Sequence, residues 1–215
     1  MLITLKSWMR RYRGTAALLE LYFLRKFYLK QSGWLESRYL SQPVDQDKNP
    51  IPWLTYSSIH FLNQALSPEM SLFEYGSGNS TLWYSQRVRH IVSVEHDKSF
   101  FDLIESKIGL LPNVDLSYAE LPTEYIESIK STGQKFDVVV IDGRERVSCS
   151  RMAVDYLTDS GVIIWDNSER QRYQEGIEFL KEKGFRKIDF MGHGPIGHHQ
   201  SCTSIFYRKD NCLEI

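Results

Sequence analysis

The sequence predicts an α/β protein with one mostly parallel sheet that helices cover on both faces. From residue 71 onwards, short apolar runs typical of strands alternate with stretches of helical periodicity, which is the pattern of parallel strands joined by crossover helices. The runs Phe136–Ile141 and Gly161–Trp165 show no regular polar alternation, as expected for strands buried on both faces. A composition of 42% hydrophobic and 25% charged residues is ordinary for a globular protein and excludes a disordered or collagen-like chain.

The individual elements follow from the same patterns. Strands are expected at Ser71–Tyr75, Ile91–Glu95, Val114–Tyr118, Phe136–Ile141, Gly161–Trp165, Phe185–Phe190 and Ser204–Tyr207. Helices are expected at Ser80–Val88, Ser99–Ile108, Thr123–Ser131, Ser148–Leu157 and Arg172–Lys183. The last two strands have no helix between them and are joined by a loop rich in glycine and histidine, which predicts an antiparallel hairpin at that end of the sheet.

The first 70 residues are expected to form an N-terminal extension of two parts. Residues 1–40 hold eight Lys or Arg and two Glu, so this arm carries about +6 although the whole chain carries −1. Within residues 2–30, apolar side chains at three- and four-residue spacing predict one or two basic amphipathic helices. Residues 41–52, which contain three prolines, are expected to be a linker, and a helix follows at Trp53–Leu66. The α/β domain then spans residues 71–215.

The basic arm predicts a docking role, because a basic amphipathic helix can lie on a partner, a second subunit or an anionic membrane surface. A solvated helix is the alternative. The sequence has no run of about 18 apolar residues, and its three cysteines form no C-x-x-C pair, which is typical of proteins in a reducing compartment. We therefore expect a cytoplasmic protein, with peripheral attachment to a membrane as a further option.

The strongest motif is LFEYGSGNST at residues 72–81. Gly76 and Gly78 allow a sharp turn after a strand and the close approach of a ligand to the backbone. Thr81 stands where a dinucleotide-binding fingerprint has its third glycine, and the sequence contains no phosphate-binding P-loop. Glu74, two residues before the turn, would repel a pyrophosphate but attract the cationic amino group of a ligand. The motif therefore favours a cationic ligand over a dinucleotide.

A second acidic residue follows at the expected distance. Glu95 ends the strand Ile91–Glu95, roughly 20 residues after the glycine turn, where a carboxylate can accept hydrogen bonds from two ribose hydroxyls. The alternative is a stabilising charge at the start of the next helix. Together with the glycine turn, this position indicates ribose binding.

These residues give the chain a resemblance to a known family. An E-x-G-x-G after the first strand, an acid at the end of the second and Asp142-Gly143 at the end of the fourth are similar to class I S-adenosylmethionine-dependent methyltransferases. The resemblance covers about residues 50–208 and implies a Rossmann-like seven-stranded sheet whose last strand is antiparallel. It also implies that S-adenosyl-L-methionine is the cofactor.

The resemblance implies a role for each matching residue. The methionine part would lie on the glycine turn, the ribose against Glu95 and His96, and the adenine near the end of the third strand. The residues expected to bind the cofactor are Glu74, Tyr75, Gly76, Ser77, Gly78, Asn79, Ser80, Thr81, Glu95, His96, Ala119, Glu120, Asp142 and Gly143. Residues 50–56 would begin the helix that covers the cofactor. Trp53 and Tyr56 would touch it or, alternatively, serve as core aromatics.

A metal site is a further hypothesis. Asp142, Asp166 and Asn167 follow two neighbouring strands, and their oxygen atoms suit a hard cation such as Mg²⁺. The pattern is similar to catechol and caffeoyl-CoA O-methyltransferases, in which these positions hold a metal. Glu145 departs from that subfamily, which has a catalytic lysine there. In the alternative, Asp142 contacts the cofactor or its surroundings and Asn167 begins a helix cap.

The loop at residues 192–200 offers a proton acceptor. It contains His193, and histidine can act as a general base near neutral pH; a polar surface loop is the alternative. Asp142, Asp166 and His193 are thus the candidate catalytic residues. A group of arginines would make the mouth of the pocket cationic and favour an anionic acceptor: Arg144, Arg146, Arg151, Arg170 and Arg172. Nucleic acid is not the expected partner, because the domain itself is acidic.

The expected function is S-adenosylmethionine-dependent O-methylation of a hydroxyl group on a small molecule or a glycan. Two alternatives stay open. One is an aminopropyl transferase similar to spermidine synthase, which would need an acidic diamine pocket after the fourth strand, where Arg144 and Arg146 stand instead. The other is a non-catalytic scaffold that binds S-adenosylmethionine, with Glu145 as the mark of lost catalysis.

Overall fold

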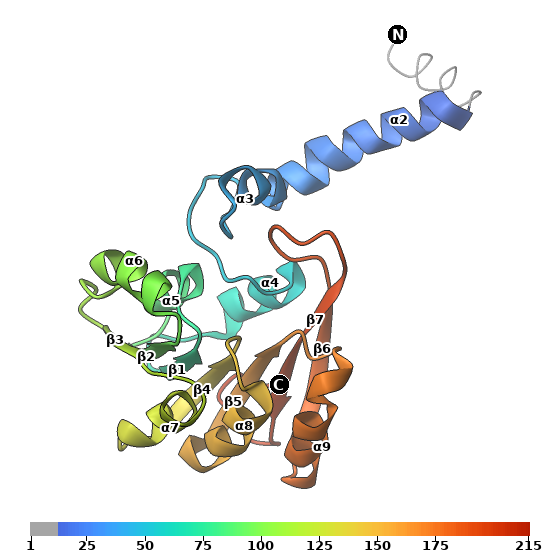
Figure 1. Ribbon diagram of the computed structural model, residues 1–215. Helices are drawn as coiled ribbons and strands as arrows, with labels where there is room; N and C mark the ends of the chain where they lie inside the picture. Colours follow the sequence, from blue (N-terminus) through green and yellow to red (C-terminus); the bar gives the residue numbers. More distant parts are fainter. Residues whose placement is uncertain (1–12) are drawn as a thin grey trace.

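The protein is built on one seven-stranded sheet with the strand order β3-β2-β1-β4-β5-β7-β6 (Figure 1). The computed structural model describes residues 13–215. β1 to β5 pair in parallel, whereas β7 is antiparallel to both β5 and β6. The strands are β1 (Ser71–Tyr75), β2 (His90–Glu95), β3 (Val114–Tyr118), β4 (Phe136–Ile141), β5 (Leu157–Asp166), β6 (Arg186–Gly192) and β7 (Ser201–Tyr207). The predicted fold class is confirmed.

Helices connect these strands and precede them. The α-helices are α2 (Arg13–Phe23), α3 (Trp34–Leu40), α4 (Tyr56–Ala65), α5 (Asn79–Ser85), α6 (Lys98–Ile108), α7 (Thr123–Ser131), α8 (Arg146–Ala153) and α9 (Gln174–Glu182). A π-helical turn at Leu24–Leu29 follows α2, and 3₁₀ turns lie at Val154–Tyr156 and Gln171–Tyr173. The predicted helix Ser148–Leu157 is wrong at its end, because residue 157 already pairs with β4 as the first residue of β5.

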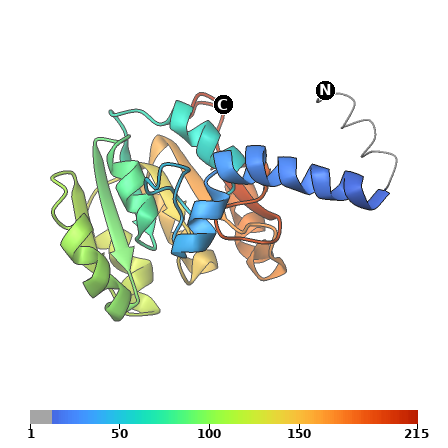
Figure 2. The ribbon, with the colours of Figure 1, turned by 90° about the horizontal axis from the view of Figure 1, so that it is seen from above.

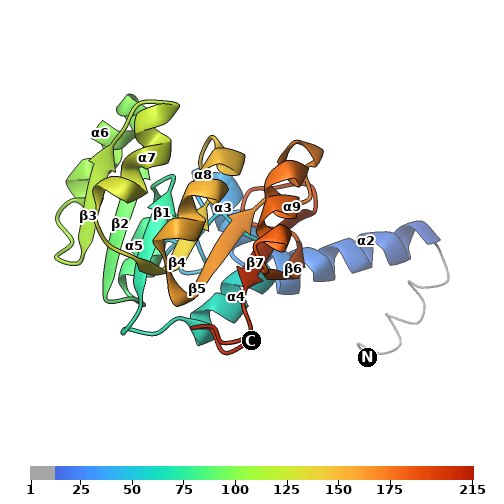
Figure 3. The same cartoon turned by 90° about the horizontal axis from the view of Figure 1, so that it is seen from below.

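The central strands β1, β2 and β4 are buried on both faces, because successive side chains of a strand point to opposite sides and helices cover each side. In β1, Phe73 packs into a core with α7, α8 and α9, whereas Leu72 packs into a second core with α4, α5 and α6. Figure 3 shows α7, α8 and α9 in a row along the sheet, with α4 on the opposite side. The helices thus leave the carboxyl ends of the parallel strands as the place for a ligand.

Helix α2, in the described part of the N-terminal arm, projects from this body (Figures 1 and 2). Leu18 and Tyr22, two members of the apolar stripe predicted for this segment, are 67% and 54% exposed on α2, so this part of the stripe is open to a partner. The predicted part of the arm at residues 1–12, with three of its basic residues, lies outside the described residues. Within residues 13–215, no helix has the length and apolar character needed to cross a bilayer. The docking role of the arm stays a prediction.

The segment predicted as a linker, residues 41–52, is packed against the domain. Val44 and Ile51 are buried, and the hydroxyl of Ser37 donates to the carbonyl of Val44 over 2.8 Å. The side-chain amide of Asn79 donates to the carbonyl of Pro43 over 2.7 Å. This segment therefore lies against the start of α5, beside the glycine turn.

Candidate functional site

The register of the central strands determines which residues meet. The last residue of β1 pairs with the penultimate residue of β2 and the last residue of β4. Gly76 and Asp142, which follow β1 and β4, and Glu95, which ends β2, therefore lie at the same edge of the sheet. The strand order also reverses at β1, since β2 and β3 lie on one side and β4 and β5 on the other, and such a switch point is where open α/β sheets bind ligands.

A cavity of about 520 Å³ opens at this place, a volume in the range of about 300–1,000 Å³ that is usual for small-molecule sites. Most of the residues predicted to bind the cofactor line it. They are Gly76, Ser77, Gly78, Asn79, Ser80, Glu95, His96, Asp142 and Gly143. The predicted residues that the wall does not include are Glu74, Tyr75, Thr81, Ala119 and Glu120.

Two glycines let the ends of β1 and β4 approach each other. Gly76 has φ +97°, and a Cβ atom there would lie 3.1 Å from the backbone of Gly143. A Cβ atom on Gly143 would lie 1.9 Å from the hydroxyl oxygen of Tyr125. Side chains at these positions would push the two strand ends apart, so the shape of the cavity depends on both glycines.

Glu74 stabilises the glycine turn through hydrogen bonds inside the domain. Its buried carboxylate accepts hydrogen bonds from Thr81 Oγ1 (2.5 Å) and Ser93 Oγ (2.7 Å), and Thr81 Oγ1 in turn accepts from the backbone N–H of Gly78 (3.0 Å). Tyr75 points to the other side of the sheet, where its hydroxyl donates to the carbonyl of Ile126. Glu74 is buried and lies outside the cavity wall, so direct binding of a ligand's amino group by Glu74 stays a prediction.

Burial raises the pKa of Glu74 from 4.5 to about 7, so unfolding should depend on pH through this group. Between pH 4.5 and 7 the folded state binds more protons than the unfolded chain, so this contribution to stability is full below pH 4.5 and is lost as the pH rises through about 7. This group adds at most about 1.4 kcal/mol per pH unit to the slope of the free energy of unfolding against pH, and we expect Glu74→Gln to remove this contribution. Urea unfolding of both proteins across this range measures it. The matched variant Glu120→Gln, at an exposed carboxyl, should keep the slope, and an unchanged slope in Glu74→Gln would refute the shift.

Glu95 is held in a fixed orientation at the cavity wall. Its Oε1 accepts from the backbone N–H groups of His96 and Asp97, each over 2.8 Å. Its Oε2 accepts from the N–H of Ser77 in the glycine turn over 3.2 Å. A carboxylate has about four acceptor positions, so Oε2 retains capacity for a ligand hydroxyl.

The apolar part of the wall comes from α6, which the sequence-based interpretation missed. Phe100, Leu103 and Ile104 line the cavity from this helix, and Leu103 is 64% exposed. The signal was present in the sequence, because spacings of three and four place these side chains on one face of the helix. Trp53 also lines the cavity, whereas Tyr56 does not.

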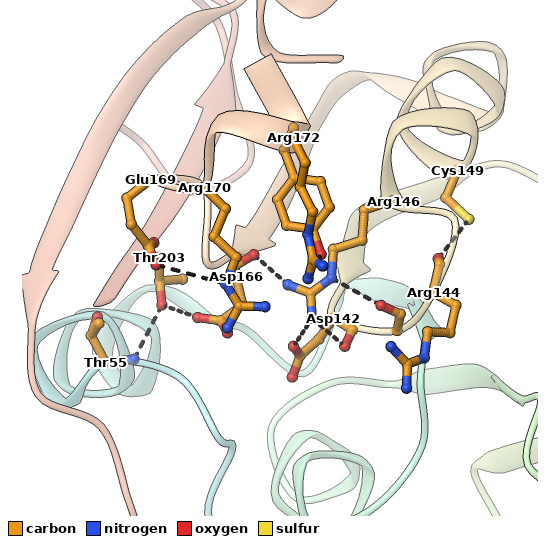
Figure 4. A network of polar contacts seen from close by, with 12 residues as sticks. Thr55, Asp142, Arg144, Arg146, Cys149, Asp166, Glu169, Arg170, Arg172 and Thr203 are labelled. Carbon is orange, nitrogen blue, oxygen red and sulfur yellow. Dashed lines mark hydrogen bonds and ion pairs between the residues drawn. The ribbon is translucent and has the colours of Figure 1, made fainter. Parts of the chain in front are cut away.

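The buried side chain of Arg146 occupies the place predicted for a metal (Figure 4). Its Nε donates to the carbonyl of Gly143 (2.9 Å), and its Nη2 donates to the carbonyl (2.8 Å) and the carboxylate (3.0 Å) of Asp142. Its Nη1 donates to the carbonyl of Asp166. One guanidinium group thus joins the ends of β4 and β5.

The residues do not fit a divalent metal at Asp142, Asp166 and Asn167. A cation placed there would meet the fixed charge of Arg146, and Oδ1 of Asp166 already accepts from the hydroxyl of Thr203 over 2.9 Å. Among residues 13–215, no group of three or more His, Cys, Asp or Glu side chains is placed to hold a metal. The charge of Arg146 and the existing hydrogen bonds of the two aspartates therefore argue against the Mg²⁺ hypothesis.

The two aspartates differ in their environment. Burial and the charge of Asp142 raise the pKa of Asp166 above its usual range. Burial also raises the pKa of Asp142, but the adjacent Arg146 opposes this shift. Asp142 lines the cavity and Asp166 does not. Asp142 is therefore the carboxylate available to a ligand.

His193 lies away from the cavity. Its carbonyl accepts from the N–H of Tyr56 over 2.9 Å, and the same loop accepts from Trp34 Nε1 through the carbonyl of Gly197. The loop packs against the N-terminal helices, and His96 is the histidine that the cavity wall contains. The location therefore does not support the predicted catalytic role of His193.

Comparisons with known proteins give structural matches only. No family model and no curated protein matches the chain. The precorrin-6y C5,15-methyltransferase of Geobacter metallireducens GS-15 matches with a TM-score of 0.61 at 15% identity, over 78% of this chain and 98% of that one. An O-methyltransferase of Bacillus cereus in complex with SAH matches with a TM-score of 0.59 at 15% identity, over 89% of this chain and 97% of that one.

An rRNA methylase of Streptococcus thermophilus also matches, with a TM-score of 0.52 at 12% identity, over 72% of this chain and 96% of that one. The named activities of these proteins concern different acceptors, so the likeness concerns the scaffold. The strand order with its antiparallel β7 and the glycine turn after β1 agree with it. The chain has the fold of the class I S-adenosylmethionine-dependent methyltransferases.

Proposed function

We propose that this protein transfers a methyl group from S-adenosyl-L-methionine to a hydroxyl oxygen of a small molecule or a glycan. One observation carries the proposal: the glycine turn, Glu95 and Asp142 line a single cavity at the point where the strand order reverses. The matching structures support it, since they include an O-methyltransferase bound to SAH. The free cysteines Cys149, Cys202 and Cys212 support a reducing, cytoplasmic location.

The residues present fit this cofactor. Glu95 would accept hydrogen bonds from the ribose, and the turn at residues 76–78 would carry the methionine part. The apolar face of α6 would cover the adenine, in place of Ala119 and Glu120. When bound, the cofactor supplies an electrophilic methyl group on its sulfonium centre.

Asp142 is the proposed proton acceptor. A neutral alcohol is a poor nucleophile, so the acceptor hydroxyl must lose its proton as the new C–O bond forms and the C–S bond breaks. Asp142 lies in the cavity wall, and Arg146 holds one of its oxygens at 3.0 Å. The raised pKa of Asp142 makes it a better base than an exposed carboxylate. The cavity contributes by aligning the two reactants.

Cofactor binding is the first test. We expect calorimetric titration to show binding of S-adenosylmethionine and SAH, and Glu95→Ala to weaken it about 10- to 100-fold, because the hydrogen bond from a ligand hydroxyl to a charged group is lost at about 1.5–3 kcal/mol. Glu120→Ala is the matched control, since this exposed acid lies two residues after the end of β3 and outside the cavity wall, and it should bind normally. If the wild-type protein binds neither compound below millimolar concentration, the proposal is wrong.

Turnover separates catalysis from a scaffold. Formation of SAH with a panel of hydroxylated acceptors supports the methyltransferase, whereas tight binding without turnover on any acceptor would favour the non-catalytic scaffold. The aminopropyl transferase is the weaker alternative, because a diamine would meet Arg144 and Arg146 in the cavity wall.

A further inference from the structure

The cavity continues into a second hollow on the side away from the glycine turn. This hollow has a volume of about 250 Å³ and is lined by residues 143–147 together with Arg172 and Tyr173. It shares residues 143, 144, 146, 172 and 173 with the main cavity but contains neither the glycine turn nor Glu95. A molecule bound there would lie beside the cofactor, next to Asp142.

The five arginines that were predicted at the pocket mouth differ in their surroundings. The guanidinium nitrogens of Arg146 all donate hydrogen bonds within the protein, to Gly143, Asp142 and Asp166. Arg151 lies outside both cavities and pairs with Glu175 over 2.5 Å. The arginines that remain at the cavity are Arg144, Arg170 and Arg172.

These three cations have little local compensation. Within residues 13–215, Arg144 and Arg172 form no ion pair, whereas Arg170 approaches Glu169 at 3.9 Å and its charge also lowers the pKa of Asp142. The other carboxylate oxygen of Glu169 already accepts from the backbone N–H of Cys202. Glu145 is the remaining carboxylate in the wall of the second hollow. The arginines therefore leave net positive charge facing the cavity.

Arg172 is also held in place before any ligand arrives. Its Nη2 donates to the hydroxyl of Tyr173 over 2.9 Å, and its guanidinium group lies 4.8 Å from the centre of that ring. The guanidinium group of Arg146 lies 5.4 Å from the same ring. Figure 4 shows Arg144, Arg170 and Arg172 around the aspartate-bound Arg146. Preorganised guanidinium groups favour planar, two-point binding of oxyanions.

We propose that Arg144, Arg170 and Arg172 bind an oxyanion of the methyl acceptor, a carboxylate or a phosphate, and thereby direct its hydroxyl group toward Asp142. The role of the bound molecule as a methyl acceptor rests on the proposed function, whereas the anion site itself does not. An acidic sugar and a sugar phosphate are the two sources of such a group.

The anion site is tested first, with inorganic phosphate as the probe. Phosphate is titrated against the full chain by calorimetry, with and without SAH, at an ionic strength kept constant with chloride. We expect Arg172→Gln and Arg144→Gln each to weaken phosphate binding at least 10-fold, whereas Arg151→Gln, an exposed arginine, leaves it unchanged. SAH affinity should stay within about 3-fold of wild type in all three variants. Because the two substitutions lie in different segments, the test still gives a result if one of the variants misfolds.

Other outcomes overturn the inference in different ways. If the arginine variants lose SAH but keep phosphate, these side chains bind the carboxylate of the cofactor. If phosphate binds equally well to every variant, these arginines do not form an anion site. If phosphate binding needs the arginines but SAH never binds, the anion site stands and the methyltransferase proposal fails.

Matched acceptors then distinguish the sources of the anion. SAH formation is measured with glucose, glucuronate and glucose 6-phosphate. We expect turnover to need an anionic group and to fall at least 10-fold in Arg172→Gln. A preference for glucuronate identifies the carboxylate and a preference for glucose 6-phosphate the phosphate, whereas faster turnover of uncharged glucose contradicts the assignment.

Discussion

Arg146→Met is expected to lower the free energy of unfolding by about 3–5 kcal/mol, because removing one partner of a buried ion pair leaves the other charge without compensation. The guanidinium group of Arg146 holds three carbonyls and the Asp142 carboxylate at the ends of β4 and β5. Its loss leaves these acceptors unpaired and Asp142 without its counter-charge. Urea unfolding at pH 7 measures the change.

The same substitution at Arg151 is the matched control, since this residue lies on the same helix, α8, but is half exposed, and its contacts are an ion pair with Glu175 and the ring of Phe179. An exposed pair contributes about 0–1 kcal/mol, so Arg151→Met should unfold almost as the wild type does. Arg146→Lys should rescue only part of the loss, because an ammonium group cannot reproduce the planar fork. Equal stability of Arg146→Met and Arg151→Met would contradict the role given to Arg146.

Arg146 also shows where inference from the sequence ended. The sequence placed Asp142, Asp166 and Asn167 at the ends of adjacent strands, which is correct, and converging oxygen atoms suggest a cation. Whether this cation is a metal or a side chain depends on the path of one arginine, which strand periodicity does not determine. The available signal was the spacing of four residues between Asp142 and Arg146, at which the two form an ion pair.

The fold itself was largely predictable because buried parallel strands have a strong apolar signature. β1, β3, β4 and α7 begin and end at the predicted residues. The start of β5 was missed because Leu157–Ser160 is not uniformly apolar and the register with β4 shifts between Phe136 and Val138. The pattern of apolar residues within one segment does not predict such a register shift, because the shift depends on the neighbouring strand.

The candidate site was predictable where backbone geometry governs it and less so where side chains from distant segments meet. The glycine turn, Glu95 and Asp142 were found because each follows a strand in the same sheet. The position of His193 was not, because its loop packs against Trp34 and Tyr56, far away in the sequence. Long-range contacts of this kind leave no local period in the sequence.

Gly143→Ala is expected to cost at least about 2 kcal/mol of stability and to abolish cofactor binding, because overpacking of a filled site forces the backbone to move. The new Cβ atom would lie 1.9 Å from the hydroxyl oxygen of Tyr125, a side chain that is fully buried on α7, and 3.1 Å from the carbonyl oxygen of Tyr75. The end of β4 must then move away from β1, and the cavity wall moves with it. Urea unfolding and SAH titration measure the two effects.

Removal of the Tyr125 hydroxyl tests this cause directly. Tyr125→Phe alone should change the stability by no more than about 1 kcal/mol, because the buried hydroxyl forms no well-aligned hydrogen bond within residues 13–215. Combined with Gly143→Ala, it removes the 1.9 Å contact but leaves the ring carbon Cζ at 3.0 Å, so the double variant should regain at least about 1 kcal/mol without reaching the wild type. Such a gain is a coupling energy between the two positions. Additive losses in the double variant would show that Gly143 is required for its backbone conformation instead of for the space beside Tyr125.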